Sequence, residues 1–400
     1  MSQPVLVLEN PIQDYAWGSR TAIAELLGRP VPSAGPEAEL WIGAHPKAPS
    51  RVVAPAGLGT LDQAIENDPV GILGREVCDR FGNELPFLLK VLAAAEPLSI
   101  QAHPSHEQAR RGWERENSEG VPVEAPHRNY RDPNHKPELV CALTAFTALK
   151  GFRAAADVAR NLESIARPEI APELGRLARD QTPLALRALF ARLMTLDPEE
   201  QAPLVERATG EARRRRGADP AWEWVARLTS RYPGDVSAVA PLYLNVVALA
   251  PGDALFLPAG ELHAYLEGTA LEIMANSDNV LRGGLTPKHV DVPELLATLV
   301  FEGHPPEVLK PAESGPGERV YRTPAREFEL ALLDVLPERP FAPSPGRGVE
   351  ILLGLAGATR LLAGGQTTPL GPGRSVLVPA ALDTYTVEGS GRLCRARVPA

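Results

Sequence analysis

The texture of the sequence changes twice along its 400 residues, and this change limits the folds that the chain can adopt. Up to about residue 150 the chain consists of short apolar runs between turn residues, which is typical of short strands. From residue 154 to about residue 231 it is rich in Ala, Leu, Arg and Glu at helical spacing, and Pro183, Pro198 and Pro220 stand where helices can begin. Short apolar runs then resume, and 41 prolines and 34 glycines indicate many turns. The sequence therefore predicts a mainly β protein with one compact α-helical insert.

Length and charge exclude several classes of protein. A chain of this length is too long for one ordinary core and predicts two or three domains. The net charge of -9 argues against a nucleic-acid partner, and we interpret the one basic run, Arg213–Arg216, as an exposed helix face. No apolar run approaches the roughly 20 residues that cross a bilayer, and the first residues lack the pattern of a signal peptide.

The three cysteines bear on the compartment. Cys78, Cys141 and Cys394 are scattered and odd in number, which favours buried thiols in a reducing cytoplasm. We therefore expect a cytoplasmic protein with neither a nucleic-acid nor a membrane partner, and we expect it to be a monomer.

A faint repeat lies in the second half of the chain. Residues 251–268 align without gaps to residues 372–389, and both copies have the pattern of a turn, a strand, a proline-marked turn and a second strand. Thr384 occupies the place of His263 in the second copy. We therefore expect the chemistry in the first copy, and a supporting unit without metal in the second.

Four side chains that bind metals well lie in short motifs. Gln101 and His103 are two residues apart at the end of a predicted strand, so both side chains point to the same face. Glu138 ends the segment Asn-His-Lys-Pro-Glu, and His263 lies in the first copy of the repeat. Two imidazoles, a carboxylate and an amide oxygen, with no thiolate, suit a divalent ion such as zinc. Three strong ligands and a weak one also leave room for water or substrate, which is typical of a catalytic zinc.

The first copy of the repeat also fits the second conserved motif of the cupin superfamily. The matching residues are Gly252, Pro258, Gly260 and His263, although Glu267 stands where that family has Asn. Cupins are small antiparallel jelly-roll barrels.

The first cupin motif, usually His-x-His, is replaced by Gln101-Ala-His103, and in this departure the chain resembles the type I mannose-6-phosphate isomerases. Four more segments carry the same resemblance: Tyr15-Ala-Trp-Gly18, 38–49, 132–138 and 275–289.

This resemblance covers most of the chain and implies its architecture. The fold class expected is mainly β with an α-helical insert, made of two jelly-roll (cupin) β-barrel domains and a small helical domain. We place the catalytic zinc cupin at residues 1–152 and 233–315, the helical insert at 153–232, and the metal-free second cupin at 316–400.

The resemblance also implies a cofactor and an activity. The family interconverts mannose 6-phosphate and fructose 6-phosphate with one zinc ion (Zn2+), which feeds activated mannose (GDP-mannose biosynthesis) or returns mannose to glycolysis. Its zinc ligands correspond to Gln101, His103, Glu138 and His263, and its active-site arginine corresponds to Arg282.

Aldose–ketose isomerisation moves a proton between C1 and C2 through an enediol(ate), so it needs an electrophile, a base and a binding site for phosphate. A guanidinium suits an enediolate or a phosphate, and Gly283 and Gly284 allow a loop to approach a ligand closely. With the family resemblance we predict that Arg282 is catalytic and that Lys288 contacts the substrate phosphate.

Three further residues are predicted to line the pocket. Lys136 precedes Glu138 by two residues and could act as an acid or base or contact phosphate. Ser99 lies two residues before Gln101 on the same strand face and is a phosphate candidate. Glu272 alternates with apolar residues on a strand and could be a base or a partner of Arg282; Glu39 is a weaker candidate.

Two other functions fit parts of the pattern. Two histidines and a carboxylate also resemble the iron site of a metal-dependent cupin oxygenase. A non-catalytic sugar-phosphate-binding cupin is the third possibility, and the intact ligands together with Arg282 and Lys288 argue against it.

Overall fold

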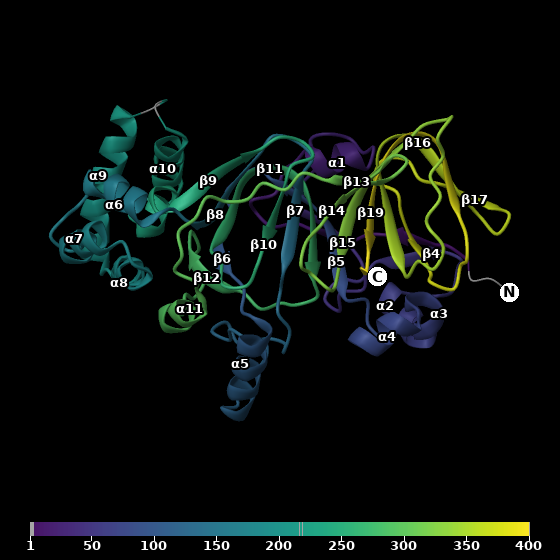
Figure 1. Cartoon of the computed structure of the whole chain (residues 1–400), viewed down its shortest axis with the longest axis horizontal. Helices are drawn as coiled ribbons and strands as arrows, with labels where there is room; N and C mark the ends of the chain where they lie inside the picture. The colour runs from purple at the N-terminus through teal and green to yellow at the C-terminus, as the bar shows by residue number, and fades with distance from the viewer. Residues whose placement is uncertain (1–3, 216, 218, 400) are drawn as a thin grey trace.

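The computed structural model describes residues 4–215, 217 and 219–399 as an elongated molecule with three regions in a row. Helices form one end, strands from the middle of the chain form the centre, and the C-terminal strands form the other end (Figure 1). The prediction of a mainly β protein with a helical insert is confirmed. None of the described helices is long and apolar enough to cross a membrane.

The central region is a sheet of ten strands among the described residues. Its strands are β2 (Ile12–Gln13), β3 (Glu39–Ile42), β5 (Phe87–Ala94), β6 (Ile100–Ala102), β7 (Glu138–Ala142), β8 (Phe146–Phe152), β9 (Leu244–Leu249), β10 (Ala254–Leu257), β11 (His263–Ala275) and β12 (Leu281–Gly284). The long strand β11 pairs antiparallel with β5, β6, β7 and β8. One strand therefore organises the segments that carry the predicted metal ligands.

The helical insert follows β8 and returns to β9. It comprises α6 (Ala155–Glu163), α7 (Ala171–Asp180), α8 (Pro183–Met194), α9 (Pro198–Arg214) and α10 (Pro220–Arg231), and the 3-10 helix η1 (Val236–Leu242) connects it to β9. Pro183, Pro198 and Pro220 begin helices as predicted, because proline needs no N–H partner in the first turn. The residues 213–215 of the basic run are exposed, as predicted, and Arg216 lies outside the described residues.

The C-terminal region is a nine-stranded sheet within the described residues. Its strands are β13 (Ala312–Gly315), β14 (Glu318–Tyr321), β15 (Glu329–Val335), β16 (Glu350–Ala363), β17 (Gln366–Pro369), β18 (Ser375–Val378) and β19 (Thr386–Arg397), joined by β1 (Leu6–Glu9) and β4 (Arg51–Ala54) from the N-terminal part. The sequence did not predict that β1 and β4 join the C-terminal sheet, because the apolar pattern of a strand does not specify which strand it pairs with. The domain boundaries at 152, 232 and 315 stay a prediction.

The two copies of the repeat have the same local structure. In the first copy β10 is followed by a turn and β11, and in the second copy β18 is followed by a turn and β19. The glycines that begin the copies, Gly252 and Gly373, have φ values of 88° and 72°. Those that end them, Gly268 and Gly389, have φ values of 115° and 109°. Because these values favour glycine, the repeat reflects a shared backbone and is confirmed.

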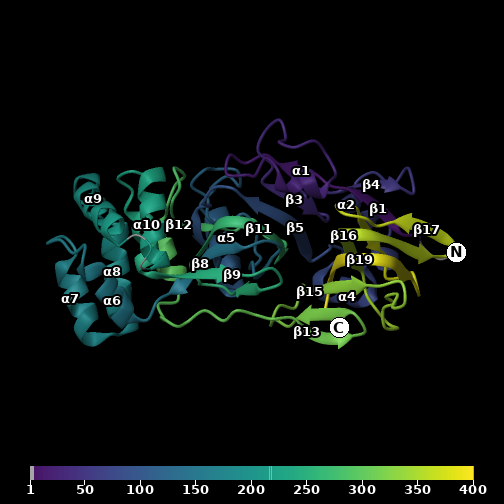
Figure 2. The ribbon, with the colours of Figure 1, turned by 90° about the horizontal axis from the view of Figure 1, so that it is seen from above.

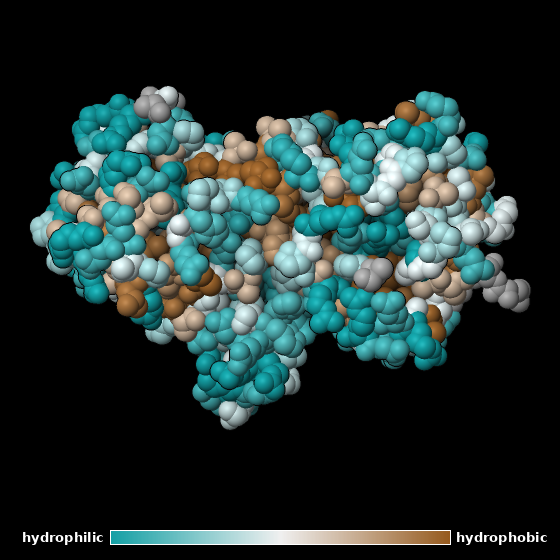
Figure 3. All heavy atoms as spheres, viewed as in Figure 1, coloured by the Kyte–Doolittle hydropathy of each residue, from teal (hydrophilic) through white to brown (hydrophobic). Residues whose placement is uncertain are grey.

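The N-terminal part holds more helix than the strand pattern indicated. Its helices are α1 (Ala22–Leu26), α2 (Leu61–Asn67), α3 (Pro69–Leu73), α4 (Arg75–Phe81) and α5 (His106–Ser118), and α11 (Val292–Thr298) follows β12. Helix α5 projects from the central region, and its surface is hydrophilic in Figure 3. A polar helix of this kind lacks the apolar stripe on which the prediction of helices relied.

The cysteines are free thiols, as expected from their scattered positions. Cys141 and Cys394 are buried, and Cys78 is half-buried. Burial raises the pKa of the Cys141 thiol to about 11, so this thiol stays protonated and unreactive.

Candidate metal centre

Three of the predicted ligands meet at one end of the central sheet. Glu138 begins β7, His263 begins β11, and His103 follows β6, and each of these side chains is about 1% exposed. The Nε2 atom of His103 lies 3.3 Å from Glu138 Oε1, and the Nε2 atom of His263 lies 3.3 Å from Glu138 Oε2. One ligand atom from each residue lies within 4.8 Å of the others. The carboxylate therefore stands between two imidazoles.

Gln101 supplies the fourth group. It pairs with His263 across β6 and β11, and the nitrogen of its amide lies 3.3 Å from His263 Nε2. Because the oxygen and nitrogen of an amide are assigned rather than observed, rotation by 180° would present the oxygen at this position. The structure thus brings all four predicted ligands together.

The second nitrogen of each imidazole fixes its orientation. The Nδ1 atom of His103 contacts the main-chain oxygen of Asn279 at 2.7 Å, and that of His263 contacts the main-chain oxygen of Glu261 at 3.1 Å. A carbonyl only accepts, so both Nδ1 atoms must carry the proton, and both Nε2 lone pairs point at the site.

Two polar atoms in the interior of the site lack hydrogen-bond partners and are free to bind a cation. His103 Nε2 and Glu138 Oε2 are buried and have no hydrogen-bond partner. Burial lowers the pKa of His103 and keeps its ring neutral. Burial alone would raise the pKa of Glu138, but the neighbouring Lys136 holds it well below its ordinary value. Neutral imidazoles and an ionised carboxylate with unused lone pairs form a donor set that fits zinc.

Lys136 lies against this site, as predicted. Its Nζ atom is 3.0 Å from Glu138 Oε1, and its side chain is buried. Only the Glu138 carboxylate therefore separates the Lys136 Nζ atom from the metal position.

Glu272 lies in a second buried cluster and does not pair with Arg282. Its carboxylate accepts hydrogen bonds from Lys90 Nζ at 3.0 Å and from the Tyr265 hydroxyl at 2.9 Å. Glu39, the weaker candidate, accepts from Trp41 Nε1 at 2.6 Å and lies 3.8 Å from Lys90. The suggested ion pair between Glu272 and Arg282 is thus wrong, because the register of β11 and β5 places Lys90 opposite Glu272.

Lys90 is a buried charged residue near the site that the sequence analysis missed. Burial alone would lower its pKa, but Glu272, Glu39 and Glu138 outweigh burial and raise it, so Lys90 stays charged. Its signal was a single lysine in the apolar strand Phe87–Ala94, since a charge is rarely buried there without a partner.

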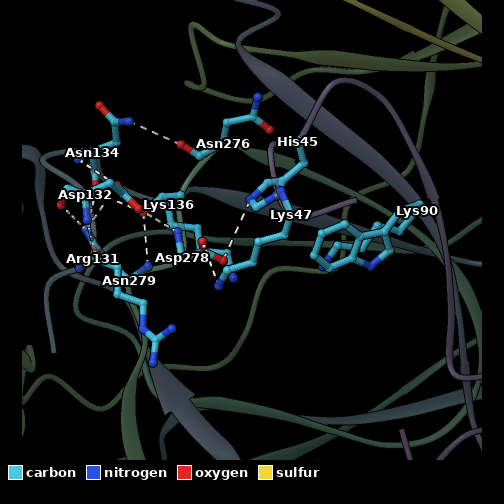
Figure 4. Close-up of polar contacts among 12 residues, drawn as sticks. His45, Lys47, Lys90, Arg131, Asp132, Asn134, Lys136, Asn276, Asp278 and Asn279 are labelled. Carbon is cyan, nitrogen blue, oxygen red and sulfur yellow. Dashed lines mark hydrogen bonds and ion pairs between the residues drawn. The ribbon is translucent and has the colours of Figure 1, made fainter. Parts of the chain in front are cut away.

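Two loops beside the site are tied together by Asn279. Its amide accepts from the main-chain N–H of Arg131 at 2.7 Å and donates to the main-chain oxygens of Asp132 and Asn134 at 2.8 and 2.9 Å. Figure 4 shows these contacts as dashed lines, with Lys136 close by. The loop that leads to Lys136 and Glu138 is therefore fixed to the segment whose carbonyl orients His103.

The remaining predicted residues surround the same end of the sheet. Arg282 pairs with Gln101 across β12 and β6, and Ser99 immediately precedes β6. Lys288 is exposed on the loop after β12. Burial lowers the pKa of Arg282, as does the charge of Arg131, and burial together with Arg282 and Arg131 lowers the pKa of Lys288. Arg282 and Lys288 have no carboxylate partner among the described residues, so this cluster of cations suits an anionic ligand.

His135 lies three residues before Glu138 in the sequence, but its side chain contacts another part of the molecule. Its Nε2 atom lies 2.8 Å from Glu327 of the C-terminal region. It thus joins two regions of the molecule and does not contact the metal ligands.

Comparison with known proteins places this geometry in a family. A family model described as phosphomannose isomerase type I, catalytic domain, matches residues 5–155. The chain is 43% identical to mannose-6-phosphate isomerase of Escherichia coli K12, over 97% of this chain and 98% of that protein, and 35% identical to the human protein of that name, over 83% and 82%. A crystal structure of zinc-bound mannose 6-phosphate isomerase superposes with a TM-score of 0.92 at 40% identity, covering 99% of this chain and 100% of the other.

Proposed function

The chain belongs to the type I mannose-6-phosphate isomerase family, and from this premise we propose that it interconverts mannose 6-phosphate and fructose 6-phosphate with one bound zinc ion. We assign the zinc to Gln101, His103, Glu138 and His263. The observation that carries the proposal is the convergence of the buried His103, Glu138 and His263 beside Gln101, with unused lone pairs on His103 Nε2 and Glu138 Oε2. The expected cytoplasmic location and monomeric state remain predictions.

Bound zinc would act as a Lewis acid or would orient the open-chain sugar. The residues of the chain supply the other requirements of the reaction. Arg282, half-buried and without a carboxylate partner in the described part of the chain, would stabilise the negative charge of the enediolate. Lys288 and Ser99 would bind the phosphate at the same end of the sheet.

Lys136 is our candidate for the group that moves the proton between C1 and C2. It is buried and lies 3.0 Å from Glu138, which places its amine next to the metal position. Glu272, the other candidate, already accepts hydrogen bonds from Lys90 and Tyr265. We therefore assign Glu272 to holding Lys90 in place at the pocket wall.

A coupled assay on mannose 6-phosphate tests the proposal. We expect turnover that is lost when a chelator removes the metal, that returns when zinc is added, and that does not depend on oxygen. Turnover that survives complete removal of zinc would contradict the ligand assignment. Oxygen consumption would instead favour a cupin oxygenase, and zinc-dependent binding of the sugar phosphate without turnover would favour a non-catalytic module.

A further inference from the structure

We propose that the helical insert positions the phosphate-binding loop of the active site, and that Ser237 of η1 is the residue that transmits this effect to Lys288. The inference rests on the proposed function, because it takes Lys288 as a contact of the substrate phosphate. It assigns a role to the insert, which contributes none of the predicted metal ligands.

The loop that follows Arg282 has an unusual backbone. Leu285 has φ of 52°, although it is not a glycine, and it is only 3% exposed. Gly284 before it has φ of 130°. Leucine rarely adopts the left-handed region, because its Cβ atom crowds the backbone there. Such a conformation persists only where its surroundings hold it in place.

Ser237 provides the contact that holds it. The main-chain N–H of Leu285 donates to Ser237 Oγ at 2.7 Å, and Ser237 Oγ donates to Asp235 Oδ1 at 2.6 Å. A Cβ atom on Gly284 would lie 2.2 Å from Ser237 Cβ, so the contact leaves no room for a side chain at position 284. Ser237 is 2% exposed, so the hydrogen bond that its hydroxyl accepts is shielded from water.

The helices of the insert hold η1 in turn. The main-chain N–H of Val236 donates to Gln201 Oε1 of α9 at 3.2 Å. The segment η1 contacts α6, α8, α9 and α10 of the insert and also contacts β12. Figure 2 shows the helices of the insert at one end of the molecule, beside β8 and β9 of the central region. A continuous set of contacts therefore leads from the insert to the loop.

The two cations of the loop depend on this contact to different extents. Arg282 is held by its pairing with Gln101 across β12 and β6. Lys288 lies three residues beyond Leu285 and is exposed, and its main-chain N–H bonds only locally, to Thr286 Oγ1 at 3.1 Å. If Leu285 relaxed to a negative φ, the direction of the chain toward Lys288 would change. Ser237 is thus a positioning residue for Lys288 more than for Arg282.

A double-mutant cycle on the zinc-loaded full chain tests this inference. Ser237→Ala should raise KM for mannose 6-phosphate about tenfold, the scale of one lost buried hydrogen bond, with kcat little changed. The same change in a Lys288→Ala background should have no further effect on KM, because the group it positions is gone. Ser164→Ala, which removes a local hydrogen bond to the Asn161 carbonyl within the insert, is the matched control and should leave KM unchanged.

Amide hydrogen exchange over residues 283–288 provides a readout that does not depend on activity. Exchange there should be faster in Ser237→Ala than in the wild type or in Ser164→Ala. An unchanged KM, or an equal rise of KM in both backgrounds, overturns the inference. If the wild type has no isomerase activity, the proposed function fails, while the exchange rates still decide whether Ser237 holds the loop. If Ser237→Ala does not fold, Ser237→Cys, whose thiol is a weaker acceptor, should change both readouts in the same direction by less.

Discussion

In the first copy of the β repeat His263 is buried at the start of β11, whereas its counterpart in the second copy, Thr384, is exposed beside β19. The interiors of the central and C-terminal regions also differ, in whether their charged and polar groups have partners. Around His263, ligand atoms lie buried without partners, and Arg282 at the edge of the site has no carboxylate partner among the described residues.

In the C-terminal sheet the buried Arg395 contacts Glu350 and also Glu318, the latter at 2.5 Å, and the Tyr385 hydroxyl donates to Glu350 at 2.5 Å. The same backbone unit can therefore keep charged groups available for a ligand or neutralise them against one another. Groups that stay available can bind a ligand, whereas groups that neutralise one another stabilise the fold.

Mutation of the aligned positions His263 and Thr384 should reveal the largest difference between the two copies of the repeat. His263→Ala removes one of three strong ligands, so we expect loss of bound zinc and of turnover. Thr384→Ala, at the same place in the other copy, should change neither, because the side chain is exposed. Elemental analysis and the isomerase assay measure both variants. Full zinc occupancy in His263→Ala would contradict the assignment of this ligand.

The next largest effect concerns arginine. Arg282→Ala should keep its zinc but lower kcat by about 10²–10³, since a group that stabilises developing charge has been removed. Arg360→Ala, which breaks an exposed pair with Glu388 at 3.0 Å in the C-terminal sheet, should leave kcat unchanged. Steady-state kinetics separate the two roles of Arg282: if only KM rises, this residue binds substrate and does not stabilise the enediolate.

The C-terminal region should respond in stability and not in activity. Glu350→Gln leaves the buried charge of Arg395 less well compensated, so we expect the free energy of unfolding to fall by about 2–3 kcal/mol. Glu388→Gln, on the surface of the same sheet, should cost well under 1 kcal/mol. Denaturant unfolding measures both. A loss of zinc from Glu350→Gln at temperatures where it is folded would show that the two regions are not independent.

The residues that meet at the candidate metal centre could be predicted because their signals are local. Gln101 and His103 are two residues apart at the end of β6, and His263 lies in a turn–strand motif whose form is kept in the second copy. The starts of the helices in the insert were predicted for the same reason, since a proline in the first turn acts within its own segment.

Features that depend on distant segments could not be predicted. Lys90 meets Glu272 only through the register of two strands 182 positions apart in sequence. The strands β1 and β4 join the C-terminal sheet by pairings that their own apolar patterns do not specify. The contact from His103 goes to the main-chain oxygen of Asn279, and any residue type could supply that oxygen.

The smallest effect should be a loss of stability at acidic pH, and it should arise in the region that holds the metal centre. Burial lowers the pKa of His45 from 6.5 to about 4, against the opposing effect of Asp278. The folded chain therefore binds fewer protons than the unfolded chain between pH 6.5 and about 4, so the free energy of unfolding falls as the pH falls through this window.

From pH 7 to pH 5 this one group should cost about 2 kcal/mol. His45→Gln has no such titration, so its unfolding free energy should fall by that much less than the wild type over the same interval. Because both proteins share every other titrating group, the difference between their denaturant curves isolates His45. Equal losses in the two proteins would mean that His45 becomes protonated without unfolding, with Asp278, which lies 3.7 Å from its Nε2 atom, compensating the charge.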